Sequence, residues 1–153
     1  MKLYQLKTKQ NIPISIDKAW SFFSNPENLK EITPKEMNFT IISGANRSIY
    51  SGQIIQYKVT PMLGISTKWV TEITHVKEKE YFVDEQRFGP YALWHHKHFI
   101  KEIEGGIEME DIVDYKIPFG LLGQFAHWLF VKNKLNQIFK YREQILIKLF
   151  GKF

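Results

Sequence analysis

The chain has 153 residues, the length of one ordinary domain, and can bury roughly two-thirds of its unfolded surface. Hydrophobic residues make up 44% and charged residues 24%, which is typical of globular rather than disordered proteins. The absence of cysteine excludes disulfides, thiolate chemistry and cysteine-ligated metal sites. No apolar run approaches the ~20 residues that span a bilayer, and the opening MKLYQLK lacks a signal-peptide core. We therefore expect a single domain over residues 1–153, located in the cytoplasm.

The positive charge is concentrated near the end of the chain. The net charge is +5, and residues 120–153 carry six basic residues and one acid, Glu143, so the whole excess lies there. A basic segment can meet nucleic acid or an anionic membrane, or it can be the hydrated face of an ordinary helix. We expect no nucleic acid partner.

The first predicted elements are a strand over residues 3–12 and two short helices. Ser15 can cap the first helix, whose apolar residues Ile16, Ala19, Trp20 and Phe23 fall at helical spacing. Asn25-Pro26 ends this helix and begins the second, since proline suits the first helical position.

Strands and one long helix follow. We predict strands near residues 37–42, 50–60, 65–75, 80–88, 94–103 and 107–117, and a helix from about Leu121 or Gln124 to Phe150. This order predicts an α+β fold, in which a curved antiparallel seven-stranded sheet surrounds the long helix. The expected apolar stripe of the helix comprises Phe125, Trp128, Leu129, Leu135, Ile138, Phe139, Ile145, Leu146 and Leu149.

Charge pairing predicts the register of the last three strands. A two-residue turn at Gly105-Gly106 places Lys101 opposite Glu110 and Lys97 opposite Asp114. A link over residues 89–93 then places Glu85 opposite Lys97. This face is mostly charged, so we expect it to be the outer one.

The opposite face carries polar residues where a plain core would have none. In the predicted register Asp84 lies beside His98, Gln86 beside His96 and Phe88 beside Trp94. Buried polar groups need partners, so a cavity lined by aromatic and polar side chains is the simplest explanation. Its expected ligand-binding wall comprises Asp84, Gln86, Phe88, Trp94, His96, His98, Asp111 and Tyr115.

At this point the sequence resembles a bacterial SRPBCC subfamily of the START/Bet v1-like superfamily, known as polyketide cyclase/dehydrase-like or "cell division inhibitor" proteins. Together the matching segments cover nearly the whole chain. One departure is Ile100, where an aromatic residue is expected. The segments are WSFFSNPENL (20–29), FVDEQ (82–86), GPY (89–91), WHHKH (94–98), DIVDY (111–115), PFG (118–120) and IFKYR (138–142).

The resemblance implies a helix-grip fold, in which the sheet grips the C-terminal helix around a hydrophobic cavity. It also implies binding or transport of a lipid-like or polycyclic molecule. It does not fix a reaction, because proteins of this fold include cyclases, lipid carriers and ligand sensors.

The histidines allow three interpretations. Asp84, His96 and His98 could act as acid and base in a cyclase, dehydratase or hydrolase. They could hold a metal ion, or they could form a satisfied polar network that positions a ligand. We expect the last, with no metal or cofactor. The leading function is therefore a carrier or sensor of a hydrophobic small molecule. The enzyme is the alternative, and an interaction protein acting through its basic helix is a third class.

Three links between elements are unusually apolar for surface loops. Residues 60–64, 89–93 and 118–123 are predicted to lie at one end of the sheet. They either pack together as a plug or form a mouth for an apolar ligand. Lys132 and Lys134 lie close enough to that end to support a weak, transient contact with an anionic membrane.

Overall fold

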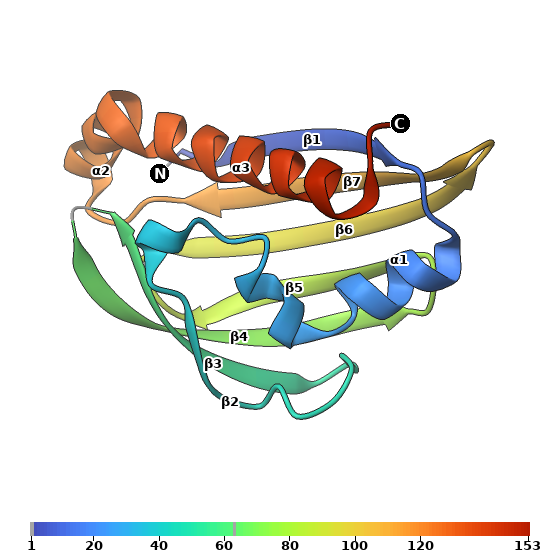
Figure 1. Ribbon diagram of the computed structural model, residues 1–153. Coiled ribbons are helices and arrows are strands. Elements are labelled where there is room, and N and C mark those ends of the chain that lie inside the picture. The colour runs from blue at the N-terminus through green and yellow to red at the C-terminus, as the bar shows by residue number, and fades with distance from the viewer. Residues whose placement is uncertain (1, 63) are drawn as a thin grey trace.

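The strand order places the first and last strands of the chain side by side. The computed structural model describes residues 2–62 and 64–153, and its single antiparallel sheet has the order β1-β7-β6-β5-β4-β3-β2 (Figure 1). The expected seven-stranded sheet is confirmed. The strands are β1 (Tyr4–Ile12), β2 (Thr40–Ser43), β3 (Gln53–Met62), β4 (Ile65–Lys77), β5 (Tyr81–Phe88), β6 (Leu93–Ile103) and β7 (Gly106–Lys116).

Helical segments cover the concave side of the sheet. After β1 come α1 (Ile16–Phe23) and two short 3-10 helices, η1 (Pro26–Lys30) and η2 (Lys35–Met37). The C-terminal helix has three parts, namely α2 (Gly120–Ala126), a π-helical turn η3 (His127–Val131) and α3 (Lys132–Phe150), and it runs along the sheet in Figure 1. Among the described residues no helix combines the length and the apolar character needed to cross a membrane.

The predicted caps of the short helices form. The Ser15 hydroxyl accepts a hydrogen bond from the Lys18 amide at 3.3 Å, and the Asn25 side chain accepts one from the Glu27 amide at 3.1 Å. Each satisfies an amide that has no partner within the helix. Ala19, on the apolar face of α1, is fully buried.

The β6–β7 turn lies one residue earlier than predicted. It is formed by Glu104-Gly105, with Gly105 at φ +84°, so Lys101 lies opposite Glu108. Gly106 already pairs with Ile103 in the sheet. This position requires glycine, because a Cβ there would lie 2.1 Å from the Ile12 carbonyl oxygen. Moving a turn by one residue shifts each pair by two. The predicted pairs were therefore wrong, although every side chain remained on its predicted face.

The β5–β6 pairs are shifted by two residues as well. Glu85 lies opposite His95 and Asp84 opposite His96. The reason is that the Gln86 side chain holds the link: it donates to the Tyr91 carbonyl at 2.7 Å and accepts from the Tyr91 amide at 3.2 Å. Strand pairing therefore stops at Glu85.

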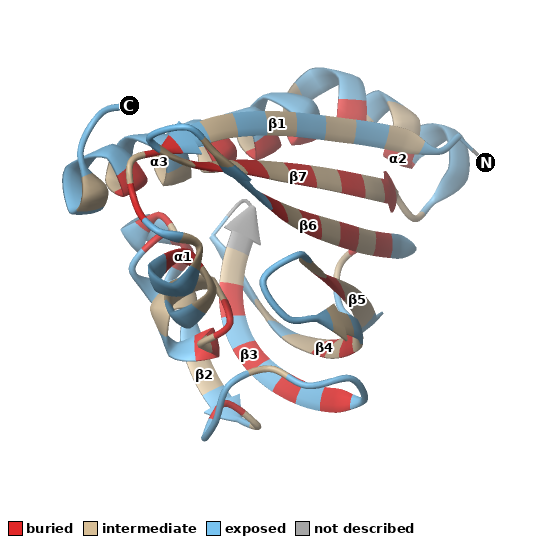
Figure 2. Ribbon diagram, turned by 90° about the vertical axis from the view of Figure 1, so that its right-hand side faces the viewer, coloured by how far each residue is buried: buried red, intermediate tan, exposed pale blue. Residues whose placement is uncertain are grey.

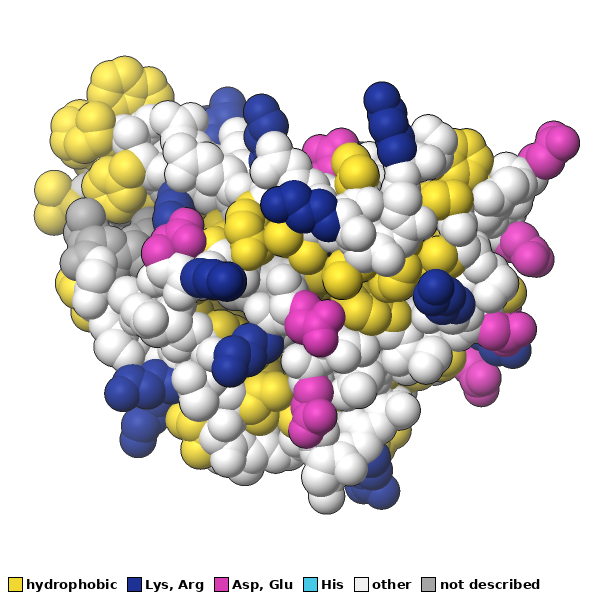
Figure 3. All heavy atoms as spheres, in the orientation of Figure 1, with side chains coloured by type: hydrophobic (Ala, Val, Ile, Leu, Met, Phe, Trp, Pro, Cys, Tyr) yellow, Lys and Arg dark blue, Asp and Glu magenta, His cyan; other side chains and the backbone are white. Residues whose placement is uncertain are grey.

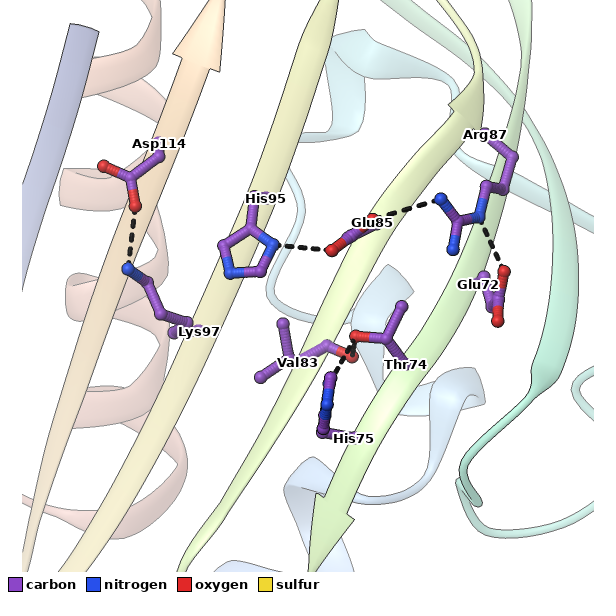
Figure 4. Close-up of polar contacts among 9 residues, drawn as sticks. All are labelled: Glu72, Thr74, His75, Val83, Glu85, Arg87, His95, Lys97 and Asp114. Atoms are coloured by element: carbon purple, nitrogen blue, oxygen red, sulfur yellow. Dashed lines mark hydrogen bonds and ion pairs between the residues drawn. The ribbon is translucent and has the colours of Figure 1, made fainter. Parts of the chain in front are cut away.

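The outer face carries a ladder of charges, as expected (Figure 4). Lys97 reaches diagonally to Asp114 at 2.7 Å, so this predicted ion pair forms although the two residues are not directly opposite. The adjacent rungs are His95–Glu85 at 2.8 Å, Arg87–Glu85 at 3.1 Å and Arg87–Glu72 at 2.6 Å. The inner face is thus left to apolar and cavity-lining side chains.

The buried face of the C-terminal helix differs from the predicted stripe in its first third. Phe125, Trp128 and Leu129 are exposed, whereas the buried residues there are Gly123, His127 and Val131. The cause is η3, because a π-turn contains more residues than an α-turn and changes which residues face the sheet. Beyond η3 the predicted Leu135, Phe139 and Leu146 are buried and Ile138 and Ile145 are half-buried, but Leu149, near the end of the helix, is 45% exposed.

Two neighbouring residues of α3 test this packing. Leu146 is 2% exposed in the core below α1, whereas Ile147 is 37% exposed. We expect Leu146→Ala to lower the free energy of unfolding by about 2–5 kcal/mol, because it leaves a cavity. Ile147→Ala should cost less than about 1 kcal/mol. Urea unfolding followed by circular dichroism measures both, and equal losses would contradict the packing described.

Candidate ligand-binding site

A cavity of about 190 Å³ lies between the concave face of the sheet, the α1–η2 segment and α3. Most of its lining is apolar, and the aromatic side chains come from elements far apart in the sequence. Tyr57, Trp69 and Trp94 line it from the sheet, Phe39 from the segment before β2, and Leu135 and Phe139 from α3. This composition suits an apolar ligand.

Polar side chains gather on one wall of this cavity. Asp84 comes from β5, His96 and His98 from β6, and Arg142 from α3. Asp111 of β7 does not line the cavity but lies behind the histidines, 5% exposed. His96 and His98 are 4% and 6% exposed, so the wall is screened from bulk water.

Asp111 Oδ1 is the centre of the hydrogen-bond network. It lies 2.8 Å from His96 Nε2, 2.8 Å from His98 Nδ1 and 3.4 Å from Arg142 Nη1. His98 also bonds Asp84 through its Nε2 at 2.9 Å, so this imidazole bridges two carboxylates. The remaining imidazole nitrogen, His96 Nδ1, lies 3.6 Å from Asp84 Oδ1, beyond hydrogen-bond distance.

Both carboxylates are ionised at neutral pH. Burial works against the charged form of Asp111, but the Arg142 guanidinium and the hydrogen bonds from both histidines outweigh it and hold the pKa of Asp111 well below its usual value. Burial opposes ionisation of Asp84 too, yet the hydrogen bond from His98 and the neighbouring positive charges lower the pKa of Asp84.

The two histidines are driven in opposite directions. Burial works against a charged His98, but its hydrogen bonds to Asp111 and Asp84 prevail and raise the pKa of His98. Burial and the adjacent charge of His98 lower the pKa of His96, despite the hydrogen bond to Asp111. The buried charges therefore balance: two carboxylates face the His98 imidazolium and the Arg142 guanidinium, while His96 is neutral.

Several polar atoms of the wall have no hydrogen-bond partner among the described residues, and two of them matter for a ligand. Arg142 Nε is buried without a hydrogen bond among the described residues, although its guanidinium lies 5.0 Å above the Phe139 ring. Neutral His96 donates its Nε2 proton to Asp111, so its Nδ1 carries a lone pair with no donor. Arg142 and His96 both line the cavity, so the wall has a free donor on one residue and a free acceptor on the other.

The geometry offers little to a metal ion. One potential ligand atom from each of Asp84, His96 and His98 lies within 4.8 Å of the others, a set that could hold a cation. Both nitrogens of His98 are engaged with carboxylates, however, and Arg142 already supplies positive charge beside them. A cation would have to displace a balanced set of charges.

The structure brings half of the predicted wall to the cavity. Asp84, Trp94, His96 and His98 line it, and Asp111 supports the histidines from behind. The other three were placed wrongly. Phe88 is 72% exposed, because the β4–β5 pairing is irregular between Gln86 and Phe88, and Gln86 holds the β5–β6 link instead. Tyr115 is buried but bonds His127 at 2.9 Å, away from the cavity.

Sequence reasoning missed Arg142. It follows Phe139 by three residues on the buried side of α3, and a lone basic residue within an apolar helical stripe is the signal that could have identified it. The sequence pattern instead assigns all the basic residues of the helix, Arg142 included, to its hydrated surface.

The pKa of His98 predicts a pH dependence of stability. A pKa raised in the folded state stabilises below the unfolded value of about 6.5, and this contribution is lost as pH rises through the folded pKa. We expect His98→Gln to cost roughly 3–5 kcal/mol at pH 6, because it leaves Asp84 and Asp111 uncompensated. The cost should shrink toward alkaline pH.

Urea unfolding of wild type and variant across pH 6–10 measures this. His75→Gln, at an exposed histidine of β4, is the matched control and should follow the wild-type profile. A cost of His98→Gln that stays constant with pH would contradict the bridging role of a charged imidazole.

The sequence matches no protein-family model and no curated protein. Solved structures resemble it closely in fold. Protein CV1439 from Chromobacterium violaceum superimposes with a TM-score of 0.74 at 9% identity, covering 97% of this chain and 99% of that protein. A START superfamily protein from Mycobacterium smegmatis gives 0.70 at 14% identity, over 95% and 98%. Ara h 8.0201 gives 0.60 at 16% identity, over 96% and 99%. The chain therefore has the helix-grip fold of START and Bet v 1-like proteins, as its motifs implied.

Proposed function

We propose that the chain binds a small apolar molecule with a hydroxyl group inside the cavity. The observation that carries this proposal is the pair of unpartnered atoms on the polar wall. Arg142 Nε can donate to the hydroxyl oxygen, and His96 Nδ1 can accept the hydroxyl proton. A hydroxyl group is both acceptor and donor, so it suits both atoms.

The cavity volume limits the ligand in this conformation. An engineered protein cavity of about 150 Å³ accepts benzene, so about 190 Å³ accommodates one substituted ring. A lipid-like or polycyclic ligand needs more room. It could gain that room where α3 approaches η2, since the contact there includes a partly exposed ion pair between Lys134 and Glu36 at 3.6 Å. Such pairs near the surface contribute at most about 1 kcal/mol to stability, so moving α3 away from η2 costs little at this contact.

Three one-ring probes test the polar wall. Toluene has no polar group, 4-methylanisole adds an acceptor, and p-cresol adds both acceptor and donor. We expect p-cresol to bind most tightly and toluene least. A hydrogen bond to a charged group contributes about 1.5–3 kcal/mol, or roughly tenfold and more in affinity. Isothermal titration calorimetry measures the order.

Arg142→Met should remove the advantage of both oxygen-bearing probes while leaving toluene affinity unchanged. Lys140→Met, at an exposed position of the same helix, is the matched control and should keep the wild-type order. Retained toluene binding also shows that the Arg142 variant is folded. If p-cresol binds the wild type no better than toluene does, the proposed role of the wall is wrong.

Acid–base catalysis on the bound molecule is a second candidate function. It is favoured by neutral His96 and cationic His98, whose ring centroids lie 3.7 Å apart and which supply a base and an acid on one wall. Native mass spectrometry of the purified protein identifies a co-purified ligand. Incubation with that ligand then decides: a product that wild type forms and His96→Gln does not supports the enzyme, and an unchanged ligand supports the carrier.

A further inference from the structure

A row of large apolar side chains lies unpacked on the outer side of α2 and η3. The exposed fractions of Phe119, Leu121 and Leu122 are 82%, 84% and 78%. The row continues at helical spacing through Phe125, Trp128 and Leu129, at 60%, 72% and 54%. We call these six residues the α2 stripe. Hydrophobic side chains gather at this corner in Figure 3, and Figure 2 shows α2 largely exposed.

The orientation of the stripe is fixed by the opposite side of the same helix. His127 is buried, its Nε2 lies 2.9 Å from the Tyr115 hydroxyl, and its ring stacks on Tyr4 at 3.6 Å. A Cβ on Gly123 would lie 1.9 Å from the Pro118 carbonyl oxygen, so α2 is also packed tightly against the preceding chain. The stripe is therefore a surface of the folded protein.

Other elements extend the apolar surface at this end of the sheet. Phe88 and Leu93, which flank the β5–β6 link, are 72% and 36% exposed, and Ile65 after the β3–β4 link is 65% exposed. Tyr91, within the β5–β6 link, is buried and lines the cavity. The packed-plug alternative therefore fails for residues 119–122. Leu63, part of the third apolar link, lies outside the described residues.

The chain segments at this end of the molecule carry no acidic residue. Residues 2–4, 58–68, 87–93 and 115–132 contain no aspartate or glutamate, and Glu36 of η2 pairs with Lys134 of α3 at 3.6 Å. Among the described residues, five lysines of these segments form no ion pair: Lys2, Lys58, Lys68, Lys116 and Lys132. The links at the opposite end, residues 77–80 and 101–108, carry five acids. The two ends of the sheet thus differ strongly in charge.

We propose that the α2 stripe docks on an anionic membrane surface, with the surrounding lysines facing lipid headgroups. Apolar insertion and cationic contact together produce such binding, and Trp128 suits the boundary between headgroups and acyl chains. Charge decides against a second copy of the chain, because a symmetric dimer on this face would bring lysines against lysines. The proposal stands apart from ligand binding, since it requires nothing in the cavity.

Vesicle co-sedimentation of the full chain tests it. Wild type should bind vesicles of phosphatidylglycerol and phosphatidylcholine in equal parts, and bind pure phosphatidylcholine far less. Salt of ~1 M, where the Debye length is ~3 Å, should weaken binding. Leu122→Asp should lower the partition coefficient at least about tenfold, because burial of a leucine is lost.

Leu149→Asp is the matched control. It makes the same change in charge at a leucine that is 45% exposed, about 40 Å along the C-terminal helix. It should bind as wild type does. Thermal unfolding of both variants must show that they are folded.

Trp128 provides a second readout. Its emission should shift to the blue on anionic vesicles, and Trp128→Phe should lose that shift. Equal binding to neutral and anionic vesicles, or no binding, would overturn the proposal. So would equal weakening by Leu122→Asp and Leu149→Asp. A dimer in analytical ultracentrifugation that Leu122→Asp dissociates, without vesicle binding, would assign the stripe to a second copy instead.

Discussion

The compensation of two buried carboxylates constrains much of this molecule. Asp111 Oδ1 alone joins β6, β7 and α3, through His96, His98 and Arg142. An uncompensated charge at this depth would cost several kcal/mol, so the loss of any one of these contacts lowers stability. The position of α3 over the sheet, the charge of His98 and the neutrality of His96 are therefore linked. The polar wall of the cavity results from the same balance.

Aromatic rings limit what this cluster presents to the cavity. Phe82 stacks on His98 at 4.1 Å, and Phe139 meets the edge of His96 at 5.7 Å. These rings shield the imidazoles, and most of the remaining lining is apolar, with Trp69 and Trp94 in edge-to-face contact at 5.4 Å. The site therefore combines a large apolar lining with a few directional polar atoms. That combination selects by shape first and by one hydrogen-bonding group second.

The fold was predictable from the sequence because strand alternation and turn residues act locally. The errors in the site are instructive. Both hairpin pairings were displaced by two residues, and a shift by an even number preserves faces, so Asp84, His96 and His98 were still placed inside. Phe88 was not, because the β4–β5 pairing is irregular between Gln86 and Phe88. The shift of the β5–β6 pairs follows from a side-chain bond of Gln86 to the Tyr91 backbone, and no periodic pattern encodes such a contact.

The π-helical turn at His127–Val131 divides one continuous helix into a first part with exposed apolar side chains and a second part with buried ones. Wound as a regular α-helix, the same residues would rotate everything before the turn by about 100° relative to α3, since a π-turn contains one residue more than an α-turn. Phe125 and Trp128 would then fall on the apolar stripe predicted for the helix, with no change in their identity. Helical phase, rather than composition, decides whether these aromatic residues belong to the interior or the exterior. Deletion of one residue at this turn would therefore keep both parts of the helix in phase, whereas the same deletion elsewhere in the helix would rotate one part by about 100° relative to the sheet.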